Sequence, residues 1–172
     1  MLTSGASSAL APQVLDDLLL YRLSRVMRAT SCLVVRLLEG EHGITRREWA
    51  LLAALHGCEA LTSSALADRL QLDRVRTSRG LQGLLAKALV QTRRDAQDGR
   101  KVWIALTESG QALYAKIFPQ VAQINVELGA ALAPDELAIL WRSLDRLETQ
   151  GRQLMQQGRV PGKANRSRRR TR

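Results

Sequence analysis

The order of short elements between residues 62 and 106 constrains the fold most. Thr62 is a favourable N-cap for a short amphipathic helix, and Asp73 is the N-cap of another helix that begins only a few residues after the first one ends. Two β-like segments, 89–94 and 101–106, follow, and the stretch between them contains Asp and Gly. The sequence therefore predicts a helix-turn-helix followed by a β-hairpin.

A long amphipathic helix precedes this block. Apolar residues recur at steps of three and four between residues 14 and 38, and the segment 40–43, which contains two glycines, is expected to end the helix. Thr45 and Glu48 then form a predicted capping box, in which each side chain satisfies the other residue's backbone amide. This box predicts a second helix that reaches about His56.

Two further helices follow the hairpin, the first capped by Thr107 and the second opened by Pro134 at a favourable first position. The predicted fold class is mainly α with a small β-hairpin wing: a winged helix-turn-helix flanked by long helices. The predicted divisions are a flexible N-terminus over 1–13, a single domain over 14–155 (flanking helices 14–38 and 107–155, winged helix-turn-helix 45–106), and a basic disordered tail over 156–172.

The formal charge of +10 is concentrated at the C-terminus. Residues 159–172 hold seven of the 26 Lys and Arg and none of the 16 acids, so residues 1–158 carry 19 basic against 16 acidic residues, or +3. Binding of an anionic polymer by the folded part must therefore depend on local clustering of charge.

Several classes of protein are excluded by what the sequence lacks. No apolar run reaches the roughly 20 residues that a membrane-spanning helix needs, and the first 13 residues do not resemble a secretory signal, so we expect a cytoplasmic location. The chain has no Gly-rich phosphate loop, no Gly-x-Ser-x-Gly elbow and no zinc-hydrolase motif, so we expect neither catalysis nor a cofactor.

Residues 74–88 divide into two faces on a helical wheel. The side expected to face the core carries Thr77, Leu81, Leu84, Leu85 and Ala88. The opposite side, which also includes Gly83, suits base edges in a major groove, because Arg pairs with guanine, Gln pairs with adenine and Val contacts the thymine methyl group. The predicted DNA contacts on this helix are Arg74, Val75, Arg76, Ser78, Arg79 and Gln82.

The hairpin is the second candidate contact with DNA. Its basic residues surround two aspartates, and a thin turn that bears Arg fits a minor groove. Asp98 is expected to orient Arg100, although ordinary surface ion pairs are the alternative interpretation. The predicted contacts are Arg94, Asp98, Arg100 and Lys101.

Several motifs in this order resemble the MarR (multiple antibiotic resistance regulator) family of winged helix-turn-helix transcriptional regulators. They are Ile44-Thr45, the run from Ser64 to Leu70, Leu89-Val90, Asp98-Gly99-Arg100 and the run from Leu106 to Gly110. With the flanking helices the resemblance extends over about 14–155. It implies a homodimer in which the flanking helices intertwine, two modules that bind a pseudo-palindromic operator in double-stranded DNA, and release of that operator by a small aromatic acid or phenol.

Three residues depart from the family pattern. Ala88 stands where the family usually has Gly before Leu-Val, and Gly80 and Gly83 fall inside the predicted recognition helix. Each interior Gly costs about 1 kcal/mol of helix propensity relative to Ala. We therefore expect this helix to become firm on DNA.

A binding site for the effector is indicated more weakly. Trp49 and His56 share a face of the second helix, and nearby basic residues suit an aromatic carboxylate. The alternative is that Trp49 belongs to the core and that His56 only ends its helix. The predicted ligand-binding residues are Arg25, Arg28, His42, Trp49 and His56.

The two cysteines leave other possibilities open. Each lies in an apolar stretch where a thiol packs well, and their spacing from the histidines matches no metal motif, so no metal is expected. Cys58, close to His56, is the better candidate than Cys32 for an oxidation-responsive regulator of the same fold. A non-specific nucleic-acid packaging protein would account for the basic tail.

Overall fold

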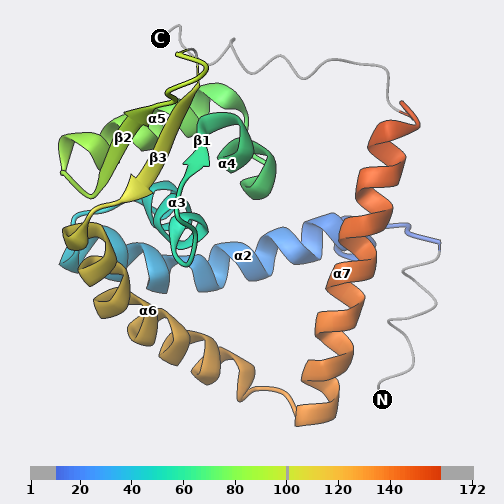
Figure 1. Ribbon diagram of the computed structural model, residues 1–172. Helices are drawn as coiled ribbons and strands as arrows, with labels where there is room; N and C mark the ends of the chain where they lie inside the picture. Colours follow the sequence, from blue (N-terminus) through green and yellow to red (C-terminus); the bar gives the residue numbers. More distant parts are fainter. Residues whose placement is uncertain (1–10, 100, 160–172) are drawn as a thin grey trace, which may run out of the picture. The chain divides into compact units, whose positions relative to one another are not determined.

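The computed structural model describes residues 11–99 and 101–159, and Arg100 and the predicted tail from residue 160 onward lie outside the described residues (Figure 1). The described chain forms two compact units that meet between Asn125 and Val126. Its helices and strands are η1 (Leu15–Asp17), α2 (Leu19–Val35), η2 (Arg36–Glu41), α3 (Arg46–Leu55), β1 (Leu61–Thr62), α4 (Ser63–Leu70), α5 (Arg74–Ala86), β2 (Val90–Arg94), β3 (Val102–Leu106), α6 (Glu108–Gly129) and α7 (Pro134–Gln156).

The predicted helix caps are confirmed. The Thr45 amide donates to the Glu48 carboxylate at 2.7 Å, and the Glu48 amide donates to the Thr45 hydroxyl at 3.2 Å, which completes the capping box of α3. The Thr62 hydroxyl accepts from the amide of Ala65, and the Thr107 hydroxyl from the amide of Gly110. These bonds depend only on residues three apart, so local sequence determines them.

The predicted end of the first helix within residues 40–43 is confirmed, although the helix runs past its expected last residue, Leu38. Helical backbone continues as the π-helical segment η2 to Glu41 and includes Gly40. The burial of Leu37 and Leu38 in this segment outweighs the propensity cost of one glycine. The chain turns at Gly43, whose φ of +64° is the left-handed conformation that glycine adopts without strain.

The hairpin is part of a three-stranded antiparallel sheet in the order β1-β3-β2. β2 and β3 form the predicted hairpin, with Thr92 opposite Ile104 (Figure 1). Leu61 pairs with the same Ile104 from the other side, so β1 is a strand that the sequence did not indicate. Mainly helical structure with this small sheet confirms the predicted fold class.

The core of the first unit lies between the helix-turn-helix, the sheet and the start of α6. Leucines dominate it, and the side chains with the least exposure include Leu38, Leu51, Leu52, Leu66, Leu84 and Ile117. α2 and α7 differ from this part, because neither helix has a buried residue in the described chain. No helix among the described residues is long and apolar enough to cross a membrane.

Candidate nucleic-acid interface

The recognition helix α5 begins at a well-formed cap. Asp73 accepts a hydrogen bond from the Arg76 amide at 2.7 Å, and its other carboxylate oxygen lies 3.0 Å from Nε of Arg76. The Thr77 hydroxyl is buried and donates to the carbonyl of Asp73 at 3.1 Å. The first turn is therefore fixed by its own cap.

The outward face of α5 follows the helical wheel in most positions. All six predicted contacts on this helix are exposed: Arg74, Val75, Arg76, Ser78, Arg79 and Gln82. Val75 has an exposed fraction of 60% although its side chain is apolar. Thr77, Leu81 and Leu84 are buried, as expected. Leu85 and Ala88, expected on the core side, are exposed: Leu85 lies in the last turn of the helix, and Ala88 lies beyond its end at Ala86.

The two interior glycines of α5 mark close contacts with α3. A Cβ on Gly80 would lie 2.6 Å from a methyl carbon of Leu51, and a Cβ on Gly83 would collide with the carboxylate of Glu48. Gly83 therefore faces α3 and not the outward side that the wheel assigned to it. α5 is continuous from Arg74 to Ala86, so the expectation that it firms up only on DNA does not describe the structure.

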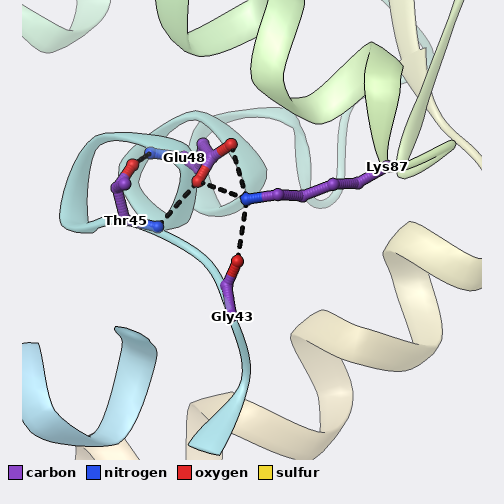
Figure 2. Close-up of polar contacts among 4 residues, drawn as sticks. All are labelled: Gly43, Thr45, Glu48 and Lys87. Atoms are coloured by element: carbon purple, nitrogen blue, oxygen red, sulfur yellow. Dashed lines mark hydrogen bonds and ion pairs between the residues drawn. The ribbon is translucent and has the colours of Figure 1, made fainter. Parts of the chain in front are cut away.

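Glu48 and Lys87 join the far end of α5 to the start of α3 (Figure 2). Nζ of Lys87 donates to both carboxylate oxygens of Glu48 at 2.9 Å and to the carbonyl of Gly43 at 2.8 Å. The Glu48 side chain is 6% exposed, and that of Lys87 is 38% exposed. Burial by itself would raise the pKa of Glu48, but the hydrogen bonds from Lys87 and Thr45 outweigh it and hold that pKa below its usual value.

Asp95 organises the tip of the hairpin. Its carboxylate accepts the indole N–H of Trp103 at 2.7 Å and the backbone amides of Gln97 and Asp98 at 2.9 Å. These bonds, the one from the indole first, lower the pKa of Asp95 to about 2. The carboxylate is thus charged throughout the physiological pH range.

The basic residues of the hairpin surround this turn. Arg93, Arg94 and Lys101 are exposed. The Asp98 carboxylate lies 3.9 Å from Nζ of Lys101. The predicted pairing of Asp98 with Arg100 involves a residue outside the described chain, so it stays a prediction.

The predicted ligand-binding residues are placed in two groups. The rings of Trp49 and His56 both stack on Tyr114 of α6, at centroid distances of 5.2 and 4.0 Å. Nothing in the sequence singled out Tyr114, because it lies 58 residues from His56 and the stack forms only in the folded chain. Nε2 of His42 lies 3.4 Å from the Oε1 atom of Gln120, also on α6.

The two arginines of this set have partners near their own helix. Arg25 forms an ion pair with Asp16 at 2.9 Å, and the Arg28 guanidinium lies 5.8 Å from the ring centroid of Tyr21. Their role toward a carboxylate therefore stays a prediction that these local contacts do not support.

The cysteines differ in their surroundings. Cys58 is half-buried, and NH1 of Arg69 donates to its sulfur at 3.2 Å. Cys32 is exposed on α2, so the expectation that it packs in an apolar interior is wrong. α2 buries no residue in the described chain, and the thiol bonds only to the carbonyl of Ala29 on its own helix.

Comparison with known proteins identifies the module built from these elements. The sequence model of the MarR family matches residues 42–101, which include the helix-turn-helix, β2 and the turn of the hairpin. The PcaV transcriptional regulator from Streptomyces coelicolor, solved with its natural ligand, is 25% identical, with a TM-score of 0.70 over 81% of this chain and 97% of PcaV. Residues 42–101 therefore form a MarR-family module, and the chain has the fold of MarR-family DNA-binding transcriptional regulators.

Two other structures of MarR-like fold are similar over most of the chain. MepR from S. aureus, solved in complex with DNA, is 24% identical, with a TM-score of 0.72 over 77% of this chain and 98% of MepR. BpsR from Bordetella bronchiseptica, whose DNA binding is regulated by 6-hydroxynicotinic acid, is 21% identical, with a TM-score of 0.74 over 80% of this chain and 98% of BpsR. A comparison with curated protein sequences found no match.

Proposed function

We propose that this protein is a homodimeric repressor of the MarR family that binds a pseudo-palindromic operator and leaves it when a small aromatic acid binds. The observation that supports the DNA-reading part is the exposed face of α5. Arg79 and Gln82 lie about one helical turn apart on this face, and Val75 is 60% exposed. Arg and Gln are the side chains that read guanine and adenine, and an outward Val suits a thymine methyl group.

Arg79→Ala tests which residues read bases. Loss of a bidentate guanine contact costs about 1–3 kcal/mol for the correct base only, so this variant should narrow the difference between operator and random duplex. The control is Lys116→Ala, which removes one exposed positive charge from α6. Competition titrations at fixed salt, against operators permuted one base pair at a time, measure the effect. An equal loss for every permutation would assign Arg79 to a phosphate.

Arg94 and Lys101 on the hairpin, together with Arg100, are proposed to enter the adjacent minor groove. Arg100→Ala should weaken operator binding, with a loss of specificity confined to A/T preference in the flanks, because the minor groove discriminates poorly between base pairs. The same permuted operators measure this. A loss of discrimination at central G·C pairs would place Arg100 in the major groove.

Dimerisation is supported by apolar side chains that the chain leaves exposed. Large apolar residues are exposed along α2 and along α7, and α7 has no buried residue. The most exposed of them are Leu20, Val26, Met27, Ile139, Trp141 and Met155. Surfaces of this kind mark contacts with other chains. Sedimentation at micromolar concentration should give twice the 19.0 kDa of one chain. A single species of 19.0 kDa would reject the dimer.

A two-fold dimer predicts the geometry of its operator. Two symmetric recognition helices enter grooves on one face of the DNA, so the half-sites should lie about one helical turn apart. Insertion of half a turn between the half-sites should abolish tight binding. Unchanged affinity would mean that the two modules act independently, and equal affinity for operator and random duplex would favour the packaging alternative.

The aromatic-acid effector is supported by the stack of Trp49, His56 and Tyr114, which brings three aromatic rings together. PcaV was solved with its natural ligand, and the DNA binding of BpsR is regulated by 6-hydroxynicotinic acid, so a small effector is reasonable for this chain. A panel of hydroxybenzoates and hydroxynicotinates, titrated against the protein–operator complex, should contain at least one compound that releases the DNA. His56→Phe keeps the stacking and removes the ring nitrogens, so it should weaken that response, whereas an unchanged response would place the ligand elsewhere.

Oxidation through Cys58 is the second candidate, favoured by the Arg69 guanidinium at 3.2 Å from its sulfur. Peroxide should then release operator from the wild type and from Cys32→Ser, but not from Cys58→Ser. Equal responses of the two variants would remove this candidate.

A further inference from the structure

All three N–H donors of the Lys87 ammonium are directed at the place where the end of α5 meets the start of α3. A lysine ammonium has three N–H donors, and three oxygens lie within 2.9 Å of Nζ: the two carboxylate oxygens of Glu48 and the carbonyl of Gly43 (Figure 2). Lys87 is the residue that follows α5, and both partners lie at the start of α3. The end of the recognition helix is thus bonded to a different helix.

The same corner is also closed sterically. The Glu48 carboxylate lies against Gly83, at a distance that leaves no room for a Cβ, and it accepts the Thr45 amide at 2.7 Å. Glu48 therefore contacts α5 from one side and completes the cap of α3 on the other. The contact between Gly80 and Leu51 lies one turn earlier along the same interface.

We infer that Lys87 and Glu48 are positioning residues for DNA recognition: their ion pair, in which the carboxylate is buried and the lysine is partly exposed, sets the tilt of α5 and so the position of its reading face. This inference rests on the proposed function of that face. α5 has 13 residues and is about 20 Å long, so a tilt of about 5° displaces one end by nearly 2 Å. Contacts with base edges tolerate a displacement of roughly 0.5 Å. A recognition helix held only by the cap at its N-terminus would therefore lose these contacts when it tilts.

Two substitutions with opposite effects on charge separate positioning from simple electrostatics. Lys87→Met removes a positive charge, whereas Glu48→Gln removes a negative charge and should leave non-specific binding unchanged or stronger. If the ion pair positions α5, both variants should lose preference for the correct sequence. Lys116→Met, on an exposed lysine of α6, is the matched control for the first substitution.

The DNA experiment uses the full-length dimer and the duplex that wild-type protein enriches most strongly from random sequence. Its dissociation constant and that of a scrambled duplex are measured at three salt concentrations, at a temperature where circular dichroism shows each variant folded. We expect the ratio of the two constants to fall at least tenfold in Lys87→Met and in Glu48→Gln, and to stay within twofold in Lys116→Met. An unchanged ratio overturns the inference, as does a uniform loss with a shallower salt slope in Lys87→Met, which would make Lys87 a phosphate contact.

Amide hydrogen exchange in the free protein provides a readout without DNA. Exchange over residues 81–89 should accelerate at least fivefold in both variants, while exchange in α4 stays unchanged. If wild-type protein enriches no sequence, the proposed reading of bases fails, and unchanged exchange over 81–89 would separately overturn the positioning role. Should Lys87→Met not fold, Glu48→Gln decides the question, because its single amide oxygen can still accept from the Thr45 amide.

Discussion

Ala88 is a residue at which a single substitution should raise stability. It has a φ of +53°, in the left-handed region that favours glycine. Two hydrogen bonds enforce this conformation at the end of α5: the Leu89 amide donates to the carbonyl of Leu84 at 3.0 Å, and the Ala88 amide donates to that of Leu85 at 2.9 Å. This is the Schellman pattern, in which glycine is the usual residue.

The expected gain from Ala88→Gly follows from two opposing quantities. Left-handed backbone costs an L-residue roughly 1–2 kcal/mol, which glycine avoids. Glycine also makes the unfolded chain more flexible, which costs about 0.4–1 kcal/mol. The difference predicts stabilisation by about 0.8 kcal/mol, or an increase in Tm of roughly 2–3 °C for a chain of this size.

Urea unfolding at one fixed protein concentration measures this gain, since the stability of a dimer depends on concentration. The control is Ala86→Gly, the same substitution two residues earlier, where the backbone is helical and exposed. It should destabilise by up to about 1 kcal/mol. If both variants lose stability to the same extent, the strain assigned to Ala88 is absent and the reasoning fails.

Three further predictions concern other contacts. Gly83→Ala should destabilise by about 1–3 kcal/mol in urea unfolding, because the methyl group meets the carboxylate of Glu48, although helix propensity alone predicts a gain of about 1 kcal/mol. The pKa of Glu48 is lowered in the folded state. The contribution of its carboxylate to stability is therefore complete above the ordinary pKa of 4.5 and is lost as the pH falls through the lower pKa of the folded state. Glu48→Gln should reduce the fall in the free energy of unfolding over this acidic range. Asp95→Asn should accelerate exchange of the Trp103 indole proton in NMR spectra, because the bond then loses its charged acceptor.

Local signals predicted much of the fold. The caps at Thr45, Thr62 and Asp73 each depend on an amide three residues away, so neighbouring residues determine them. The buried positions of α5 followed from helical periodicity as far as Leu84. The helical wheel also placed Ala88 on the buried side, because a periodicity argument does not register that the helix ends at Ala86, and it was wrong at Leu85, which is exposed inside the helix.

Contacts between distant segments were not predicted. The ion pair of Lys87 with Glu48 joins residues 39 apart, and β1 pairs with a strand some 40 residues later. Neither has a local pattern. The interior glycines were the one available signal, because a glycine that lowers helix propensity is retained where another backbone or side chain comes close. Gly83 was interpreted as a weakness of the helix, whereas in the structure a Cβ at this position would collide with the carboxylate of Glu48.

The acidic residues explain how a body with a charge of only +3 can present a basic face. Glu48 bonds to Lys87 and to the Thr45 amide, and Asp95 bonds to Trp103 and to backbone amides. Asp73 caps α5, although it also engages Arg76. These carboxylates are thus bonded to groups that stabilise the fold of the module. A carboxylate bonded in this way offsets the positive potential of the exposed arginines less than a carboxylate that lies among those arginines. The local charge available to DNA therefore depends on where the acids bond, which the net charge of the sequence does not express.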